Sequence, residues 1–299
     1  MAKKIGFIGL GTMGKPMAKN LLKAGFAVTG YDINKDAVKD VEKSGGRGTG
    51  SPKEVAGQSD VIITMLPDSP DVENVYLGLG EVIASAKRGA TIIDMSTVTY
   101  KTVKKVAAAA EAKGLEMLDA PVSGGEEGAI NATLAVMVGG KKTVFEECLD
   151  IFRALGKKIV YLGDIGMGQV VKACHQLITA TTLCAISEAL VLGTKAGADP
   201  RLMLDVIKDG TARCWMLENR APTMIRRDFT TKFKSRFHHK DLGISLDLAR
   251  DFNVPLPVTA LVHQLFGALK AKGRGELDHS AIITLFEDMA GIEVKAKEL

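Results

Sequence analysis

Gly9-Leu10-Gly11-Thr12-Met13-Gly14 lies between the apolar run Ile5-Gly6-Phe7-Ile8 and a helical pattern that begins at Lys15. This order predicts a strand, a glycine turn and a helix. The first glycine allows a tight turn, the second lets a pyrophosphate approach the backbone, and the third lets the helix pack closely on the strand. The helix N-terminus then presents free N–H groups and the positive end of its dipole to the phosphates.

An acidic residue stands where a dinucleotide site needs one. Val28-Thr29-Gly30-Tyr31 predicts a second strand, and Asp32 follows it, 18 residues after Gly14. A carboxylate at this place accepts hydrogen bonds from the ribose hydroxyls of an adenosine and repels a 2′-phosphate. We therefore predict an NAD site, with NAD preferred over NADP, formed by Gly9, Gly11, Thr12, Met13, Gly14 and Asp32. A glycine-rich turn in some other α/β protein is the alternative.

The composition is typical of a globular chain. It has 299 residues, 46% hydrophobic and 25% charged, which is enough for two domains with cores of their own. The net charge of +4 is too small to predict a nucleic-acid partner and suits a small anionic substrate. Four cysteines, without CxxC spacing or a secretory leader, predict reduced thiols in a cytoplasmic protein and no metal site. No apolar run approaches the roughly 20 residues of a membrane span, so we expect no membrane partner.

Short apolar runs alternate with helical stretches over residues 4–163. Strands are expected at 4–9, 27–32, 60–65, 90–94, 115–119, 134–138 and 158–162, with helices such as 99–113 and 142–154 between them. The runs at 61–65 and 91–94 hold few charges, as in strands that are covered on both faces. This alternation predicts a doubly wound, mainly parallel Rossmann sheet with right-handed crossovers.

The pattern changes after the glycine-rich turn at 163–168. Residues 169–196 predict one long apolar helix, and further helices are expected near 200–208, 214–225, 238–252, 256–272 and 278–291. We therefore expect an α/β NAD-binding domain over 1–163. An all-α domain for substrate binding and oligomerisation is expected over 164–299, joined by the long helix. The apolar length of that helix suits packing against a partner subunit in a homodimer or homotetramer.

Ligands bind such a sheet at the loops after the carboxyl ends of its strands. Met65 and Leu66 follow one strand and are expected to flank a nicotinamide ring, with ordinary core packing as the alternative. Thr97 follows the next strand and is placed to hydrogen-bond near that ring. Ser123-Gly124-Gly125 follows a third strand, and its hydroxyl and consecutive glycine N–H groups form a cradle for a carboxylate. A plain connecting turn has the same composition.

Hydride transfer to a carbonyl group builds negative charge on its oxygen, so the site needs a proton donor. Lys172 is the candidate, because it lies on the first turns of the long helix among apolar neighbours. A solvated surface lysine is the alternative. His175 and Gln176 follow three and four residues later, on the same helical face. They are placed to hold a substrate oxygen, or else to pack in the core.

Four motifs resemble, in order, those of the β-hydroxyacid dehydrogenase family. They are residues 6–14, Asp119-Ala120-Pro121-Val122-Ser123-Gly124-Gly125, Gly168-Gln169-Val170-Val171-Lys172 and His239-Lys240-Asp241-Leu242-Gly243. The resemblance covers nearly the whole chain and implies NAD-linked interconversion of a small 3-hydroxy acid and its semialdehyde. It also implies that Lys172 is the catalytic proton donor and that Ser123, Gly124 and Gly125 bind the substrate carboxylate. Thr97 and Lys240 would contact NAD.

Finer features bear on the substrate. His175 and Gln176 stand where many family members have an asparagine, which puts substrate choice in question. The strings at 64–70, 163–166 and 278–281 are most similar to tartronate semialdehyde reductases, whereas 210–215 is similar to the 3-hydroxyisobutyrate enzymes. Arg213 and Trp215 in that last string are expected to line the distal pocket, or else to be surface or packing residues. The basic residues of 225–240 form a solvated face or attract a substrate with a second anionic group.

The expected activity is therefore the interconversion of tartronate semialdehyde and glycerate. Alternatives within the family are 3-hydroxyisobutyrate, 2-(hydroxymethyl)glutarate or another such acid. An imine reductase is disfavoured because those enzymes commonly replace the lysine that is kept here. An oxidative decarboxylase similar to 6-phosphogluconate dehydrogenase would have a much longer C-terminal domain. A non-catalytic NAD-sensing protein would have no need of Lys172 behind a carboxylate cradle.

Overall fold

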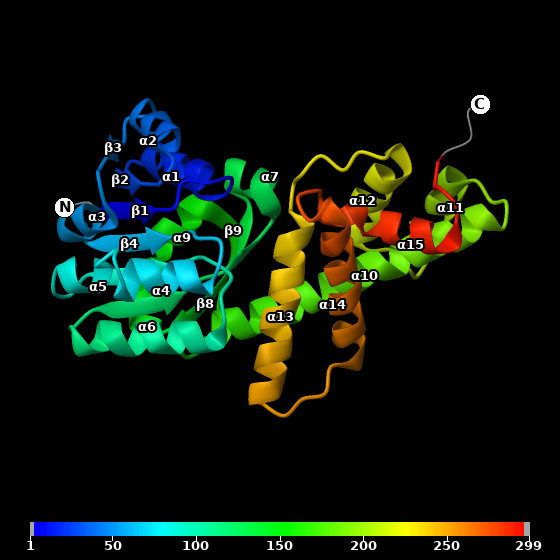
Figure 1. Ribbon diagram of the computed structural model, residues 1–299. Helices are drawn as coiled ribbons and strands as arrows, with labels where there is room; N and C mark the ends of the chain where they lie inside the picture. The colour runs from blue at the N-terminus through cyan, green and yellow to red at the C-terminus, as the bar shows by residue number, and fades with distance from the viewer. Residues whose placement is uncertain (1–2, 296–299) are drawn as a thin grey trace. The chain divides into compact units, whose positions relative to one another are not determined.

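The glycine turn joins strand β1 (Lys4–Ile8) to helix α1 (Gly14–Lys23), as its sequence predicts (Figure 1). The computed structural model describes residues 3–295. The chain falls into two units, Met1–Lys172 and Ala173–Leu299.

A single sheet organises the first unit. Its strand order is β3-β2-β1-β4-β5-β6-β8-β7, with β9 beside β8. Neighbours from β3 to β6 are parallel, whereas β8 is antiparallel to β6 and β7 and parallel to β9. The further strands are β2 (Ala27–Tyr31), β3 (Arg47–Gly48), β4 (Val61–Thr64), β5 (Thr91–Asp94), β6 (Glu116–Asp119), β7 (Val122–Ser123), β8 (Leu134–Gly140) and β9 (Gly156–Tyr161). Every predicted strand is present; β3 and β7 were not predicted, because two residues carry no periodic pattern.

Helices cover both faces of this sheet, which confirms the doubly wound prediction. One face carries α1, α2 (Lys35–Glu42), α7 (Gly125–Ile130), α8 (Lys142–Glu147) and α9 (Leu149–Leu155), packed on residues such as Phe7 and Ile63. The other face carries α3 (Pro52–Gln58), α4 (Ser69–Leu77), α5 (Val82–Ser85) and α6 (Tyr100–Ala112), packed on Ile8 and Ile62. Successive residues of one strand thus enter different cores, which is why the run Val61–Thr64 holds no charged residue and does not alternate.

Helix α10 (Met167–Lys195) is the long helix predicted at 169–196. An 18-residue window within it has a mean hydropathy of 1.6, so it is long and apolar enough to cross a membrane. The prediction that the chain holds no such run is therefore wrong. Core helices of soluble proteins pass the same test, and α10 carries four buried polar side chains with protein partners: Gln169, Lys172, Gln176 and Ser187. Length and hydropathy alone do not assign this helix to a membrane.

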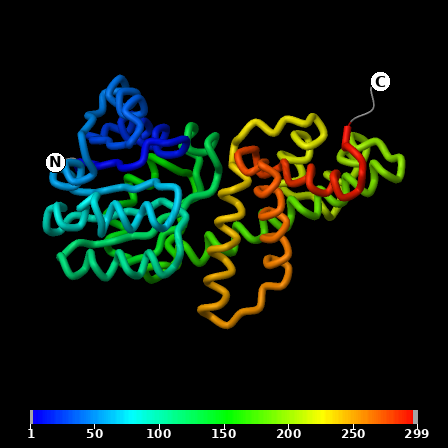
Figure 2. The backbone as a smooth tube through the Cα atoms, viewed as in Figure 1, coloured from blue at the N-terminus to red at the C-terminus, as the bar shows by residue number. Residues whose placement is uncertain are grey.

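Helices build the second unit, as predicted. They are α11 (Pro200–Ile207), α12 (Trp215–Arg226), α13 (Ser235–Asp251), α14 (Pro257–Leu269), a 3₁₀ turn (His279–Ile282) and α15 (Ile283–Ala290). Their core includes Leu183, Leu242 and Phe266. Helices α13 and α14 form a hairpin, drawn in orange shades in Figure 2. The helix expected at 256–272 ends at Leu269, and Gly273 adopts a φ of 76° just beyond it.

Two glycines of the turn offer a matched test of this packing. A methyl group on Gly14 would lie 1.8 Å from the carbonyl oxygen of Gly9, whereas one on Gly11 would meet no atom within 4 Å. We expect Gly14→Ala to lower the free energy of unfolding by about 1–3 kcal/mol and the melting temperature by several degrees. Gly11→Ala should change neither quantity. Thermal unfolding without nucleotide, followed by circular dichroism, measures both; equal melting temperatures for the two variants would contradict the packing.

Candidate active site

The glycine turn is shaped for the close approach of a ligand. Gly9 has a φ of 93°, and a side chain there would lie 2.3 Å from the carbonyl oxygen of Met65. Gly11 is exposed and faces open space. Helix α1 begins at Gly14 and has no acidic side chain in its first turn. The turn therefore offers bare backbone and a helix N-terminus to a phosphate group.

The Asp32 carboxylate lies at the end of β2 and is tied to the same turn. Its Oδ2 accepts a hydrogen bond of 2.6 Å from Leu10 N, and its Oδ1 accepts one of 2.7 Å from Asn34 N. Both donors are neutral, so they orient the carboxylate without cancelling its charge. Thr12 is exposed, and Met13 packs in part on the core. These residues fit a dinucleotide whose ribose hydroxyls reach the carboxylate.

The loops after β4 and β5 are hydrogen-bonded to each other beside the glycine turn. Leu66 N donates to Ser96 Oγ at 2.9 Å, and the Met65 carbonyl lies against Gly9. Met65 and Leu66 are half-buried, and each packs against one of the two cores. Core packing, the alternative given for these two side chains, is therefore part of their role. Thr97 follows Ser96 and is also half-buried.

Asp119, at the end of β6, holds the start of α10. Its Oδ1 accepts a hydrogen bond of 2.6 Å from Gly166 N, and its Oδ2 accepts one of 2.9 Å from Gln169 N. A side chain on Gly168 would lie 2.7 Å from the same Oδ2, so only glycine lets the helix come this close. The Gln169 side chain donates to the carbonyl oxygen of Ser96 at 2.8 Å. The first turn of α10 is thus fixed to two loops of the sheet.

Burial raises the pKa of Asp119 to about 6, although the N–H groups of Gly166 and Gln169 oppose this shift. Since this value lies above the ordinary pKa of 3.8, the folded chain binds the proton more tightly than the unfolded chain. The stability contributed by this proton is therefore complete below about pH 4 and is lost as the pH rises through about 6. At neutral pH the carboxylate is ionised and accepts both N–H groups of the helix.

Lys172 brings its amine to the loop that follows β6. The residue is 6% exposed, and Nζ donates to the carbonyl oxygen of Val122 at 2.9 Å. Val122 directly precedes Ser123, Gly124 and Gly125, and the two glycines are exposed, with φ of 135° and 61°. The structure therefore brings the expected proton donor next to the expected carboxylate cradle within the first unit. It excludes the alternative of a solvated surface lysine.

Asp241 links three predicted residues of the second unit. Gln176 Nε2 donates to its Oδ2 at 2.5 Å, and Lys240 Nζ lies 3.3 Å from its Oδ1. His175 Nδ1 lies 2.9 Å from Gln176 Oε1 and is the donor, because that oxygen can only accept. Asp241 is buried, and the sequence analysis gave it no role. Its place beside Lys240 in the fourth motif was the signal available.

Trp215 is the first residue of α12, and Arg213 lies two residues before it. Arg213 is exposed, and its Nε pairs with Glu218 Oε1 at 2.5 Å, which neutralises its charge. Trp215 is 60% exposed, and its ring centroid lies 5.1 Å from the guanidinium carbon of Arg220. Arg220 was not predicted from the sequence, because its hydrogen-bond partner His279 is 59 residues away.

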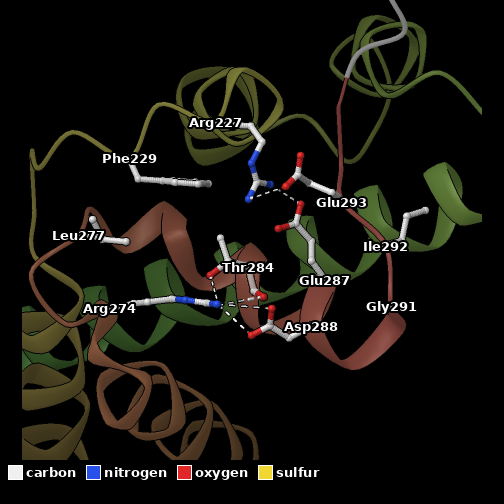
Figure 3. A pocket seen from close by; sticks show the side chains of 10 residues that line it. All are labelled: Arg227, Phe229, Arg274, Leu277, Thr284, Glu287, Asp288, Gly291, Ile292 and Glu293. Atoms are coloured by element: carbon white, nitrogen blue, oxygen red, sulfur yellow. Dashed lines mark hydrogen bonds and ion pairs between the residues drawn. The ribbon is translucent and has the colours of Figure 1, made fainter.

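Most basic side chains between residues 225 and 240 are paired with acids. The pairs are Arg227 with Glu287 and Glu293, Lys234 and Arg236 with Glu276, and Lys240 with Asp241. Arg227 also lines a hollow of about 500 Å³ in which Arg274 pairs with Asp288 (Figure 3). None of the predicted site residues lines this hollow. We therefore assign it no part of the site.

Comparison with known proteins covers both units. Residues 4–163 match the family model described as the NAD binding domain of 6-phosphogluconate dehydrogenase. Residues 166–286 match the model described as NAD-binding of NADP-dependent 3-hydroxyisobutyrate dehydrogenase. The chain is 41% identical over 292 residues to 2-(hydroxymethyl)glutarate dehydrogenase of Eubacterium barkeri, with 97% of each chain covered. It is 40% identical to 2-hydroxy-3-oxopropionate reductase of Escherichia coli, over 96% of this chain and 98% of that one.

A solved structure agrees with these sequence matches. The 3-hydroxyisobutyrate dehydrogenase of Mycobacterium tuberculosis, in a structure with L-serine, matches with a TM-score of 0.88 at 34% identity. The match covers 96% of this chain and 99% of that one. A chain that aligns end to end with such dehydrogenases and reductases, and that matches NAD-binding models over both parts, belongs to the β-hydroxyacid dehydrogenase family and is an NAD-binding oxidoreductase.

Proposed function

We propose that the protein transfers hydride between NAD(H) and a small 3-hydroxy acid of the form HOCH₂–CH(R)–COO⁻, whose oxidised partner is the semialdehyde. One observation carries this proposal: the Lys172 amine is buried against the carbonyl of Val122, directly before Ser123, Gly124 and Gly125. A cation and a carboxylate cradle side by side suit a substrate whose hydroxyl and carboxylate lie two carbons apart. This residue-level assignment is the part of the proposal that experiment has to test.

Each residue has a role in that reaction. The Ser123 hydroxyl and the N–H groups of Gly124 and Gly125 bind the substrate carboxylate. NAD(H), when bound, supplies or accepts the hydride at C4 of its nicotinamide. In the reducing direction the Lys172 ammonium gives its proton to the carbonyl oxygen as the carbonyl carbon gains hydride, and solvent then reprotonates the amine. In the oxidising direction the neutral amine takes the hydroxyl proton.

The nucleotide would be held by the glycine turn and by the neighbouring loops. Gly9, Gly11, Thr12, Met13 and Gly14 would receive the pyrophosphate, and Asp32 would accept the ribose hydroxyls. The loop residues Met65, Leu66 and Thr97, together with Lys240 from the second unit, would contact the nicotinamide half. The charge of Asp32, oriented by the Leu10 and Asn34 N–H groups, favours NAD over NADP.

The second unit would supply the contacts that choose the substrate. His175 and Gln176 take the place of the asparagine that many family members carry; Asp241 holds Gln176, and Gln176 in turn accepts from His175. Arg213 and Trp215 would lie toward the substituent R. The substrates in the names of the relatives differ in the group R. It is a hydroxyl in 2-hydroxy-3-oxopropionate, a methyl in 3-hydroxyisobutyrate and a carboxyethyl group in 2-(hydroxymethyl)glutarate. The substrate expected from the sequence alone is tartronate semialdehyde, which is another name for 2-hydroxy-3-oxopropionate.

We propose further that residues 1–163 form the NAD-binding domain and 164–299 the substrate and oligomerisation domain. Exposed apolar residues support a homodimer or homotetramer, among them Ile178 and Leu192 on α10 and Leu202 and Val206 on α11. The four cysteines are free thiols, which suits a soluble protein of the reducing cytoplasm. Neither a membrane nor a nucleic acid is a proposed partner.

Removal of the Lys172 amine tests the proposal most simply. The assay is NADH oxidation with tartronate semialdehyde, methylmalonate semialdehyde and related semialdehydes. We expect Lys172→Ala to lower turnover on the best substrate by roughly 10²–10⁴-fold, the range for a general acid, with NADH affinity nearly unchanged. Lys195→Ala, which removes the other lysine of α10, is the control and should keep full turnover. Near-normal turnover of Lys172→Ala would remove this residue from the chemistry.

The choice of nucleotide is expected to depend on the charge of Asp32. Asp32→Asn keeps an oxygen that can accept from Leu10 N but removes the negative charge that repels a 2′-phosphate. We expect the ratio of kcat/KM for NAD⁺ to that for NADP⁺ to fall by about tenfold or more. Asp36→Asn on α2 removes an exposed charge four residues later and should leave this ratio unchanged. An unchanged ratio in Asp32→Asn would contradict the assignment of Asp32.

A further inference from the structure

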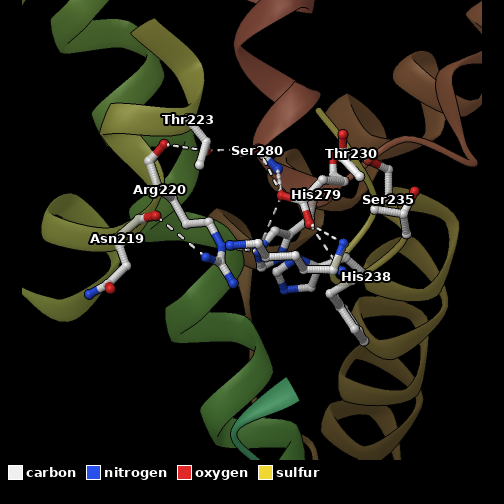
Figure 4. A network of polar contacts seen from close by, with 12 residues as sticks. Asn219, Arg220, Thr223, Thr230, Ser235, His238, His279 and Ser280 are labelled. Atoms are coloured by element: carbon white, nitrogen blue, oxygen red, sulfur yellow. Dashed lines mark hydrogen bonds and ion pairs between the residues drawn. The ribbon is translucent and has the colours of Figure 1, made fainter. Parts of the chain in front are cut away.

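A chain of hydrogen bonds joins four elements of the second unit (Figure 4). Arg220 Nε on α12 donates to His279 Nε2 at 3.1 Å. His279 Nδ1 lies 3.1 Å from His238 Nδ1, and His238 Nε2 lies 3.3 Å from the carbonyl oxygen of Gln176 on α10. Both imidazole rings are buried. The chain therefore connects an arginine in the middle of α12 with a turn of α10 that is proposed to contact the substrate.

The donors in this chain have only one consistent order. A guanidinium can only donate, so His279 Nε2 accepts and His279 carries its proton on Nδ1. That proton is donated to Nδ1 of His238, whose own proton is then on Nε2 and is donated to Gln176 O. Both histidines are therefore neutral. Burial, together with the neighbouring His238 and Arg220, lowers the pKa of His279 to about 3 although Asp278 opposes the shift, which agrees with the neutral form.

A neutral imidazole orients Arg220 without cancelling its charge. The guanidinium also lies 5.1 Å from the centroid of the Trp215 ring, and Nη1 is 3.4 Å from the carbonyl oxygen of Asn219. Within residues 3–295 no carboxylate forms an ion pair with Arg220, whereas Arg213, which lies two residues before α12 begins, is paired with Glu218. A carboxylate in place of His279 would have positioned the guanidinium as well, but would have neutralised it.

The carboxylate of Asp278, beside His279, already accepts hydrogen bonds from other groups. Asp278 Oδ1 lies 4.0 Å from His279 Nε2 and accepts hydrogen bonds from the backbone N and the hydroxyl of Ser280. Asp278 Oδ2 accepts from the backbone N–H groups of Lys232 and Phe233. These four bonds hold the carboxylate in the loop that carries it. The positive charge of Arg220 therefore stays available to an anionic ligand.

We propose that Arg220 determines substrate specificity by binding a second carboxylate, carried on the substituent R. The proposal rests on the proposed function, which fixes the reacting end of the substrate but leaves R open. Gln176, at the far end of the hydrogen-bond chain, is four residues from Lys172 along α10, about one helical turn. The guanidinium fork of an arginine matches the two oxygens of a carboxylate. The preferred substrate is then a dicarboxylic 3-hydroxy acid or its semialdehyde, in place of tartronate semialdehyde, the choice made from the sequence alone.

Two substrates of matched length test this proposal. 2-(Hydroxymethyl)glutarate and 2-(hydroxymethyl)pentanoate share the reacting end, but only the first carries a carboxylate at the end of R. Their dissociation constants are measured by calorimetry in the presence of NAD⁺, for the natural protein, Arg220→Met, Arg220→Lys and Arg226→Met. Arg226→Met removes an exposed charge from the same helix. Turnover is recorded separately, because it reports on the proposed function rather than on Arg220.

We expect the natural protein and Arg226→Met to bind the dicarboxylate more tightly. Arg220→Met should weaken binding of the dicarboxylate on the order of 10- to 100-fold, as expected for the loss of charge-assisted hydrogen bonds. It should weaken binding of the monocarboxylate less than about threefold. Arg220→Lys keeps the charge but loses the guanidinium fork, so its affinity for the dicarboxylate should lie between those of the natural protein and Arg220→Met. Equal losses for both ligands in Arg220→Met, or no preference in the natural protein, would overturn the proposal. Arg220-dependent binding without any turnover would instead refute the proposed function alone.

Discussion

The hydrogen bonds of Asp119 to the first turn of α10 are the constraint on which the rest of the site depends. They tie the end of β6 to Gly166 N and Gln169 N, and Gly168 lets the helix approach closely enough to form them. Lys172 is one turn further along, so the direction of its side chain follows from this attachment. This attachment requires that the carboxylate of Asp119 be buried, and burial raises its pKa.

Neutral partners orient three of the charged groups that are proposed to bind or react. Backbone N–H groups hold Asp32, the Val122 carbonyl accepts from Lys172, and a neutral imidazole accepts from Arg220. Each of these partners is uncharged, so it fixes the direction of the group without neutralising it. The ion pairs of Arg213 and Arg227 behave differently, because a carboxylate takes up both the direction and the charge. Arg213, although it is proposed to lie toward R, therefore shares its charge with Glu218, whereas Arg220 has an uncharged imidazole as its hydrogen-bond partner.

The sequence predicted most of the fold, because strands covered on both faces leave unbroken apolar runs and the glycine turn has a fixed chemistry. It did not reveal β3 or β7, which are too short for a pattern, and it underestimated how apolar α10 is. Lys172 and Ser123 were found through motifs. Asp241 and Arg220 were not given roles, because their partners are 65 and 59 residues away and only the tertiary fold brings them together.

The most direct test of the central claim is a crystal structure of the protein with NAD⁺ and a bound 3-hydroxy acid. The account predicts the substrate carboxylate on Ser123 and the N–H groups of Gly124 and Gly125. It also predicts the hydroxyl oxygen within about 3.2 Å of Lys172 Nζ, the reach of a general acid or base. A substrate bound with its carboxylate away from this loop, or with its hydroxyl beyond hydrogen-bonding distance of Lys172, would contradict it.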